Sequence, residues 1–268
     1  MLKDKIILLT GATGGIGSEI ARSLAAQGVR LILIDMQQQT LDSLAQILKS
    51  DTPDIELIAT DLATSQGRER VRKILEGKYE VLDGLINCAG INTFSMFADM
   101  EEEQVEKMIS VNITSPILLT KQLLPLLRRS ERGQIINFGS TFGSIAYPGF
   151  AIYSATKFAM RGFTEALRRE LAKTNISVSY IAPRATKTKI NTGPVNDMNA
   201  ALGVKMDEPS VVAVQVVEML NGKKSSTRYL GWPEKLFVKI NSVLPGMVDG
   251  ALLKKLDTIT HFACSKRS

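Results

Sequence analysis

The stretch from Thr10 to Gly17 reads Thr-Gly-Ala-Thr-Gly-Gly-Ile-Gly and decides the fold. An apolar run over 5–10 leads into it, and apolar residues follow at helical spacing over 17–27, which predicts a buried strand and then a helix. Glycines at such a turn let the backbone approach a pyrophosphate, and the helix N-terminus offers N–H groups and partial positive charge to phosphates. The alternative is a turn that needs glycine for geometry alone.

On either side of this turn, short apolar runs alternate with stretches in which apolar residues recur at helical spacing. We expect strands over 5–10, 29–34, 55–60, 81–87, 134–138, 177–181 and 227–231, and helices over 17–27, 41–48, 68–75, 101–127, 153–172 and 209–220. Pro116 predicts a kink or break in the longest helix, and residues 184–207 are expected to be irregular. The alternation predicts an α/β fold with a doubly wound parallel sheet, the Rossmann fold.

The chain of 268 residues fits one large domain with a small addition. We place a dinucleotide-binding catalytic domain over residues 1–231 and a C-terminal amphipathic helical extension over residues 232–268. Two apolar stripes in this extension are broken by Pro245-Gly246, and Lys254 and Lys255 lie beside the second. They cap the domain or form the subunit interface of a homo-oligomer; the alternative is that they lie on a membrane surface or cover a long acyl chain.

Composition excludes several classes of site. The single histidine, His261, and the two cysteines, Cys88 and Cys264, argue against a metal site, a histidine-based triad and a disulfide framework. No apolar run approaches the roughly 18 residues of a membrane span. We expect a cytoplasmic protein, at most peripheral to a membrane, without a nucleic-acid partner. The net charge of +6 indicates a basic surface, which serves solubility or attracts an anionic partner.

Asp35 ends the second predicted strand, roughly 20 residues beyond the glycines, where an acidic residue binds the adenosine ribose hydroxyls. A carboxylate there repels a 2′-phosphate. Met36 follows, and no Arg or Lys occurs before Lys49. The sequence therefore favours NAD over NADP as the cofactor; the alternative is that Asp35 only caps the next helix.

Tyr153 and Lys157 are four residues apart at the start of a predicted helix and so share one face. A free tyrosine has a pKa of about 10 and is a weak acid or base at neutral pH. A nearby ammonium and the positive charge of an oxidised nicotinamide favour the phenolate and lower that pKa. The pair is thus a candidate acid–base pair for hydride transfer.

Taken together, these residues resemble the short-chain dehydrogenase/reductase family over roughly residues 3–231. The family's Thr-Gly-x-x-x-Gly-x-Gly and Tyr-x-x-x-Lys are both present. Its Asn-Asn-Ala-Gly reads Asn87-Cys88-Ala89-Gly90, its helix asparagine matches Asn112, and its serine after the fifth strand matches Ser140. Asp61, followed by Leu62, matches the family's adenine-contacting aspartate.

The resemblance implies roles for these residues. Tyr153 would transfer the proton, Ser140 would hydrogen-bond the reacting oxygen, and Lys157 would lower the pKa of Tyr153 and hold the nicotinamide ribose. Asn112 would hold a water that links Lys157 to solvent. Cofactor contacts would come from Gly11, Gly15, Ile16, Gly17, Asp35, Asp61, Leu62, Asn87, Ala89, Gly90, Tyr153, Lys157, Pro183, Thr186 and Thr188.

One departure from the family lies after the sixth strand, where Arg184 replaces a glycine. With Lys187 and Lys189 it places positive charge at the substrate side, which favours an anionic substrate or the phosphate of coenzyme A; the alternative is a solvated loop. Substrate contacts are expected in residues 141–150 and 184–207. The first of these segments is apolar and aromatic and suits a hydrophobic small molecule.

The resulting hypothesis is an NAD(H)-dependent carbonyl reductase or alcohol dehydrogenase that acts on a hydrophobic, acyl-type substrate of lipid metabolism. Two alternatives stay open. One is a non-catalytic dinucleotide-binding redox sensor, against which the intact Ser140, Tyr153 and Lys157 speak. The other is a membrane-surface interaction protein on the same scaffold, which only the C-terminal extension suggests.

Overall fold

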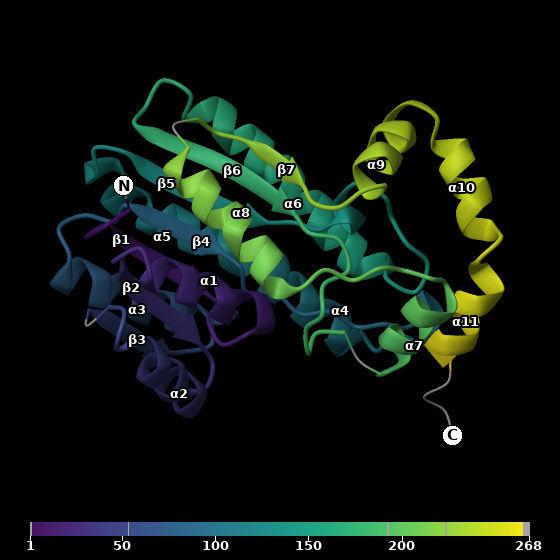
Figure 1. The fold of residues 1–268 in the computed structure, drawn as a ribbon, viewed down its shortest axis with the longest axis horizontal. Coiled ribbons are helices and arrows are strands. Elements are labelled where there is room, and N and C mark those ends of the chain that lie inside the picture. Colours follow the sequence, from purple (N-terminus) through teal and green to yellow (C-terminus); the bar gives the residue numbers. More distant parts are fainter. Residues whose placement is uncertain (1, 53, 192, 223, 265–268) are drawn as a thin grey trace.

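A seven-stranded parallel sheet forms the centre of the molecule (Figure 1). The structure is a computed structural model that describes residues 2–264 apart from 53, 192 and 223. From one edge to the other, the strands are β3 (Ile55–Ala59), β2 (Arg30–Asp35), β1 (Ile6–Thr10), β4 (Gly84–Asn87), β5 (Gly133–Phe138), β6 (Ile176–Ala182) and β7 (Thr227–Tyr229). From β1 the strands are added toward one edge as far as β3, and from β4 they are added toward the other edge. This change of direction beside β1 is what the predicted doubly wound fold requires.

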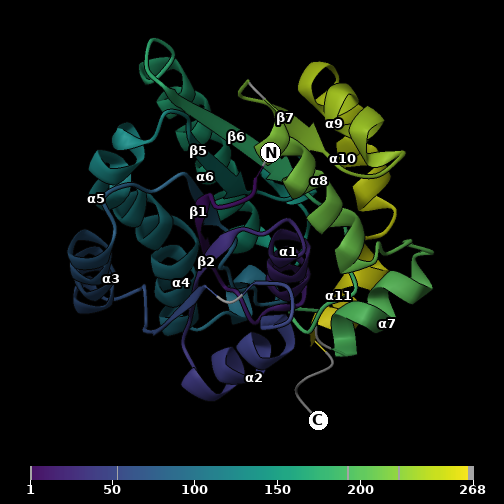
Figure 2. The ribbon, with the colours of Figure 1, turned by 60° about the vertical axis from the view of Figure 1, so that its left-hand side comes forward.

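Helices cover both faces of the sheet (Figure 2). Because successive strand residues point to opposite faces, Leu31 and Leu33 join one core and Ile32 and Ile34 the other. The first core packs under α1 (Gly15–Ala25), α2 (Gln38–Leu48) and α8 (Pro209–Asn221). The second packs under α3 (Ser65–Lys78), α5 (Ser115–Arg129) and α6 (Ala151–Glu170).

The long helix predicted over 101–127 runs on past its proline. It consists of α4 (Glu102–Ile109), a π-helical turn over Ser110–Thr114, and α5. Pro116 has no N–H to donate to the carbonyl of Asn112 and its ring crowds that carbonyl. The wider π turn directly before the proline takes up this mismatch, and it interrupts the α-helix next to the position where the kink or break is expected.

Four further helices gather at one end of the sheet, at the right of Figure 1. They are α7 (Gly193–Ala201), α9 (Glu234–Val243), α10 (Pro245–Leu253) and α11 (Leu256–Cys264); the short 3-10 turns η1 (Phe97–Asp99) and η3 (Thr141–Gly143) complete the helical elements. The expectation that 184–207 is irregular is wrong at α7, where Val195 and Met198 are buried one turn apart.

The C-terminal helices α9–α11 pack on the same end of the domain. Ile259 of α11 lies in one apolar cluster with Val195 and Met198. Val238 of α9 and Val248 of α10 lie in another, together with Ile145. The predicted break at Pro245-Gly246 is present, and a second break follows at Lys254-Lys255. No single helix in the described part of the chain is long and apolar enough to cross a membrane; α9 and α10 reach that composition only together, across a bend of 120°.

Candidate active site

A cavity of about 2230 Å³ opens at the carboxyl ends of the strands. Single-ligand pockets usually measure about 300–1,000 Å³, so this one has room for a dinucleotide and a second molecule. Most of the predicted site residues line it: Gly11, Gly15, Ile16, Gly17, Asp35, Asp61, Leu62, Ala89, Gly90, Ser140, Tyr153, Lys157, Pro183, Thr186 and Thr188. Asn87 and Asn112 do not line it and lie behind its wall.

The glycine-rich turn forms one end of the cavity and has no room for side chains. Gly11 has a φ of +65°, and a Cβ there would lie 2.8 Å from Cα of Ala89. A Cβ on Gly15 would lie 2.7 Å from Cγ2 of Thr188, so the loop after β6 closes over the turn. Gly14, the N-cap of α1, has no side chain to cap the helix. The start of α1 therefore has no side-chain cap, and it lines the cavity, where free N–H groups suit phosphate oxygens.

Asp35 lies beside this turn and accepts several hydrogen bonds. Its Oδ2 accepts from the N–H and the hydroxyl of Thr13, at 2.9 and 2.7 Å, and its Oδ1 accepts from the N–H of Met36 at 2.8 Å. A carboxylate offers about four acceptor sites, so capacity remains for a ribose hydroxyl. Asp61 is exposed at the same end, and its Oδ1 accepts from the N–H of Ala63 at 2.9 Å.

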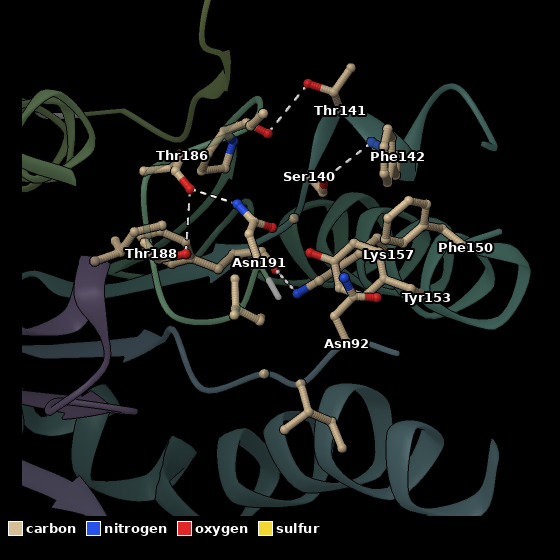
Figure 3. Close-up of a pocket in the computed structure, with 18 of the residues that line it drawn as sticks. Asn92, Ser140, Thr141, Phe142, Phe150, Tyr153, Lys157, Thr186, Thr188 and Asn191 are labelled. Atoms are coloured by element: carbon tan, nitrogen blue, oxygen red, sulfur yellow. Dashed lines mark hydrogen bonds between the residues drawn. The ribbon is translucent and has the colours of Figure 1, made fainter. Parts of the chain in front are cut away.

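Ser140, Tyr153 and Lys157 group on one wall of the cavity, as Figure 3 shows. Tyr153 and Lys157 come from the first turns of α6, and Nζ of Lys157 lies 5.5 Å from the centre of the Tyr153 ring. That Nζ donates to the carbonyl of Phe138 at 3.2 Å, at the end of β5. Ser140 follows β5 directly, and its Oγ accepts from the N–H of Phe142 at 3.1 Å. The end of β5 and the start of α6 thus bring the three side chains together.

Burial dominates the ionisation of this group. It raises the pKa of Tyr153 to about 12, and the hydrogen bond between Tyr153 and Ser140 opposes the rise. It lowers the pKa of Lys157 to about 8, because the ammonium loses hydration inside the protein. Lys157 is therefore still mostly protonated at neutral pH.

Asn112 supports this wall from behind, at the π turn. Its side chain exchanges two hydrogen bonds of 2.9 Å with the backbone of Ile91 and donates to Oγ1 of Thr156 at 3.2 Å. A Cβ on Gly90 would lie 3.3 Å from Oδ1 of Asn112 and 3.5 Å from Nζ of Lys157. The absence of a side chain at Gly90 keeps these two groups close to each other.

The structure places Asn87 differently from the predicted cofactor contact. It is buried and donates to Oγ1 of Thr120 at 3.0 Å and to Oδ1 of Asn137 at 2.8 Å, so it joins β4 to β5 and α5. Sequence reasoning gave no separate role to Thr10. Its buried hydroxyl accepts from the N–H groups of Cys88 and Ala89, both at 3.1 Å, and fixes the segment that follows β4.

On the loop after β6, Arg184 and Lys187 are already in ion pairs, whereas Lys189 lines the cavity outside these pairs. Nε and Nη2 of Arg184 donate to the carboxylate of Asp207 at 2.9 and 2.6 Å, and its Nη1 lies 3.3 Å from Glu234 of α9. Lys187 pairs with Glu208 at 2.5 Å. These ion pairs argue against the expectation that Arg184 and Lys187 attract an anionic substrate.

An aromatic wall continues from Tyr153 away from the glycine-rich turn. Phe142 stacks on Tyr147 at 5.0 Å between ring centres, and Phe150 lies 6.5 Å from Tyr153. The cavity is also lined by apolar residues of α7, the turn after it and the C-terminal helices: Val195, Met198, Leu202, Phe237, Ile240, Met247, Val248 and Leu252. The first three lie in the segment 184–207, where substrate contacts are expected, and the others lie in the extension, for which covering an acyl chain is the alternative given above. The spacing of Val195, Met198 and Leu202 is helical and is the signal that could have revealed α7.

Comparison with known proteins yields a consistent set of relatives. The family model described as short chain dehydrogenase matches residues 5–199. An oxidoreductase of Staphylococcus epidermidis is 32% identical over 72% of this chain and 82% of its own length. The Pseudomonas aeruginosa RhlG/NADP active-site complex is 26% identical, with a TM-score of 0.80 over 87% of this chain and 97% of that one. The 3-ketoacyl-(acyl-carrier-protein) reductase of Brucella melitensis, complexed with NADH, shares the fold, with 22% identity and a TM-score of 0.79 over 87% and 99%.

Proposed function

The chain belongs to the short chain dehydrogenase family, and from this premise we propose that it transfers a hydride between a nicotinamide dinucleotide and the carbonyl or alcohol carbon of an apolar, acyl-type substrate. The observation that carries the proposal is the grouping of Ser140, Tyr153 and Lys157. They lie between the glycine-lined and the aromatic parts of one cavity, where a cofactor and a substrate would meet.

The residues of the glycine-rich turn fit a dinucleotide. The positions of Gly11 and Gly15 exclude side chains, and the uncapped N-terminus of α1 offers N–H groups and partial positive charge to a pyrophosphate. Asp35 and Asp61 lie where an adenosine would extend from that pyrophosphate. When bound, the dinucleotide supplies or accepts the hydride.

The side chains of the protein manage the proton and the charge on oxygen. In the reducing direction the hydroxyl of Tyr153 gives its proton to the carbonyl oxygen as the carbon receives the hydride, which leaves an alcohol and a phenolate. The ammonium of Lys157, 5.5 Å from the ring centre, stabilises that phenolate. Ser140 donates a hydrogen bond to the same substrate oxygen.

Reprotonation of Tyr153 needs a path to solvent. Pro116 leaves the carbonyl of Asn112 without its α-helical donor, and Asn112 lies next to the space that Gly90 keeps open beside Lys157. We assign the backbone of Asn112 the task of holding a water in this relay. The resemblance to the family implies this role, and the position of the π turn beside Gly90 supports it.

For the cofactor we propose NAD in preference to NADP. The support is the carboxylate of Asp35 beside the turn, followed by the exposed and uncharged Met36. The NADP in the Pseudomonas aeruginosa RhlG complex favours the opposite choice. Comparing the dissociation constants of NADH and NADPH decides the point. Asp35→Ser combined with Met36→Arg should shift the preference toward NADPH, and tighter NADPH binding by the unmodified protein would refute the role of Asp35.

Turnover tests the proposed reaction directly. Purified protein is supplied with NADH or NADPH and with ketones and acyl thioesters of graded chain length, and cofactor oxidation is followed. We expect turnover that increases with the apolar length of the substrate, because the aromatic wall and the C-terminal helices line the cavity beyond Tyr153. Dinucleotide binding without turnover of any carbonyl or alcohol would instead support the redox-sensor alternative.

A further inference from the structure

The turn between α9 and α10 presents a continuous apolar surface to solvent. We call residues 243–247, Val-Leu-Pro-Gly-Met, the apolar tip. Val243 is 76% exposed, Leu244 53% and Met247 64%, although large apolar side chains are usually buried. The tip lies at the outer edge of the molecule, beyond the sheet and its covering helices (Figure 1).

Four lysines lie near the apolar tip in the sequence, two on α9 and two just after the end of α10. Lys235 and Lys239 precede Val243 by eight and four residues on α9, so all three share one face of that helix. Lys254 and Lys255 follow Met247 by seven and eight residues, at the break between α10 and α11, and both are exposed. None of these four lysines forms an ion pair with another described residue.

Acidic groups on α9–α11 leave this surface with a positive balance. Glu234 is held by Arg184, and Asp249 and Asp257 are exposed. The four lysines therefore outnumber the two unpaired carboxylates. With a rise of about 1.5 Å per residue, Lys239 lies about 6 Å and Lys235 about 12 Å behind Val243. An apolar element that enters the headgroup boundary by about 5–10 Å would bring these ammonium groups to the level of lipid phosphates.

The apolar surface also continues into the cavity. Phe237 and Met247 are exposed and line it, as do Trp232 and Lys255. Both helices that meet at the apolar tip thus also line the cavity. If α9 and α10 only capped the domain and faced water, they would need neither the apolar tip nor exposed apolar side chains beside the cavity.

We propose that the apolar tip and its lysines dock the protein on an anionic lipid membrane, with α9 and α10 at the headgroup level. The charge balance selects a lipid surface over a second copy of the chain, since a copy would bring the same four lysines against this set. The proposal does not depend on the reaction assigned to Tyr153.

Vesicle flotation tests the proposal on the full chain. We expect the protein to float with equimolar phosphatidylcholine/phosphatidylglycerol vesicles, to float at least tenfold less with phosphatidylcholine alone, and to be released as salt is raised, because salt screens the lysines. The variant Val243→Ser, Leu244→Ser, Met247→Ser should lose flotation. A lysine variant, Lys239→Gln with Lys254→Gln, should shift release to lower salt.

The matched control is Ile47→Ser with Val214→Ser, which alters apolar side chains of similar exposure, 51% and 52%, on α2 and α8. It should float like the unmodified protein. Circular dichroism and gel filtration accompany each variant. No flotation of the unmodified protein, equal loss in the control, or a dimer that the tip variant converts to a monomer while no vesicle binds would overturn the proposal. The last result would make this surface a subunit interface.

Discussion

Two ion pairs on the loop after β6 should differ in their contribution to stability, although they are three residues apart. The guanidinium of Arg184 donates two hydrogen bonds to Asp207 and two longer ones, of 3.4 and 3.3 Å, to Glu234. The three side chains are only 15%, 15% and 23% exposed. Lys187 and Glu208 are 55% and 57% exposed. The predicted perturbations are Arg184→Met and, as the matched control, Lys187→Met.

The expected magnitudes follow from burial. Removal of one partner from a buried pair costs about 3–5 kcal/mol, and the residual exposure of Arg184 reduces this to about 2–3 kcal/mol. An exposed pair contributes about 0–1 kcal/mol. For a chain of this size about 1 kcal/mol corresponds to about 2–4 °C in Tm. Arg184→Met should therefore lower Tm by about 4–12 °C and Lys187→Met by at most about 4 °C.

Thermal and urea unfolding of the unmodified protein and both variants measure the difference. Methionine retains most of the apolar stem of either side chain, so lost packing contributes little. An unchanged urea m-value confirms that stability, and not the unfolded state, has changed. Equal losses in the two variants, or none in Arg184→Met, would refute the assignment of Arg184 as a structural junction.

The other predictions concern the catalytic wall and its support. Tyr153→Phe should reduce turnover by about 10²- to 10⁴-fold with an unchanged NADH dissociation constant; retention of more than about a tenth of the rate would contradict the proton-transfer role. Burial lowers the pKa of Lys157 to about 8. Between about pH 8 and the unfolded pKa of about 10.4, this group therefore binds more protons in the unfolded chain than in the folded protein. The contribution of Lys157 to the free energy of unfolding thus rises with pH in that range. The difference in unfolding free energy between the unmodified protein and Lys157→Met should show that rise, and a flat difference would exclude it. Asn87→Ala should cost about 1–3 kcal/mol, because Oδ1 of Asn137 loses its buried donor, while NADH affinity stays unchanged; weaker NADH binding at equal stability would restore the original assignment of Asn87.

Much of the fold could be predicted because the strands are short apolar runs that end at turn residues. All seven strands fall within a few residues of their predicted bounds, and the glycine-rich turn fixed the first strand and helix. The grouping of Ser140 with Tyr153 and Lys157 could be predicted from the resemblance to the family, and the end of β5 and the start of α6 bring the three side chains together.

What could not be predicted depends on contacts between distant residues. Arg184 reaches partners 23 and 50 residues away, and no local pattern predicts such pairs. At the end of β4, sequence alone does not tell whether Asn87 or its neighbours face the cavity. The helix α7 has only a few apolar residues at helical spacing, beginning after Gly193, and burial by α11 stabilises it.

The junction at Arg184 also has a thermodynamic consequence. One guanidinium holds the segment before α8, through Asp207, and the start of the C-terminal helices, through Glu234. Its own backbone precedes Thr186, which lines the cavity, by two residues. Suppose a bound dinucleotide changes the equilibrium constant for displacement of these helices by some factor. By reciprocity, moving the helices then changes dinucleotide affinity by the same factor. Whatever holds the hairpin of α9 and α10 in place would in that case also be an effector of cofactor binding.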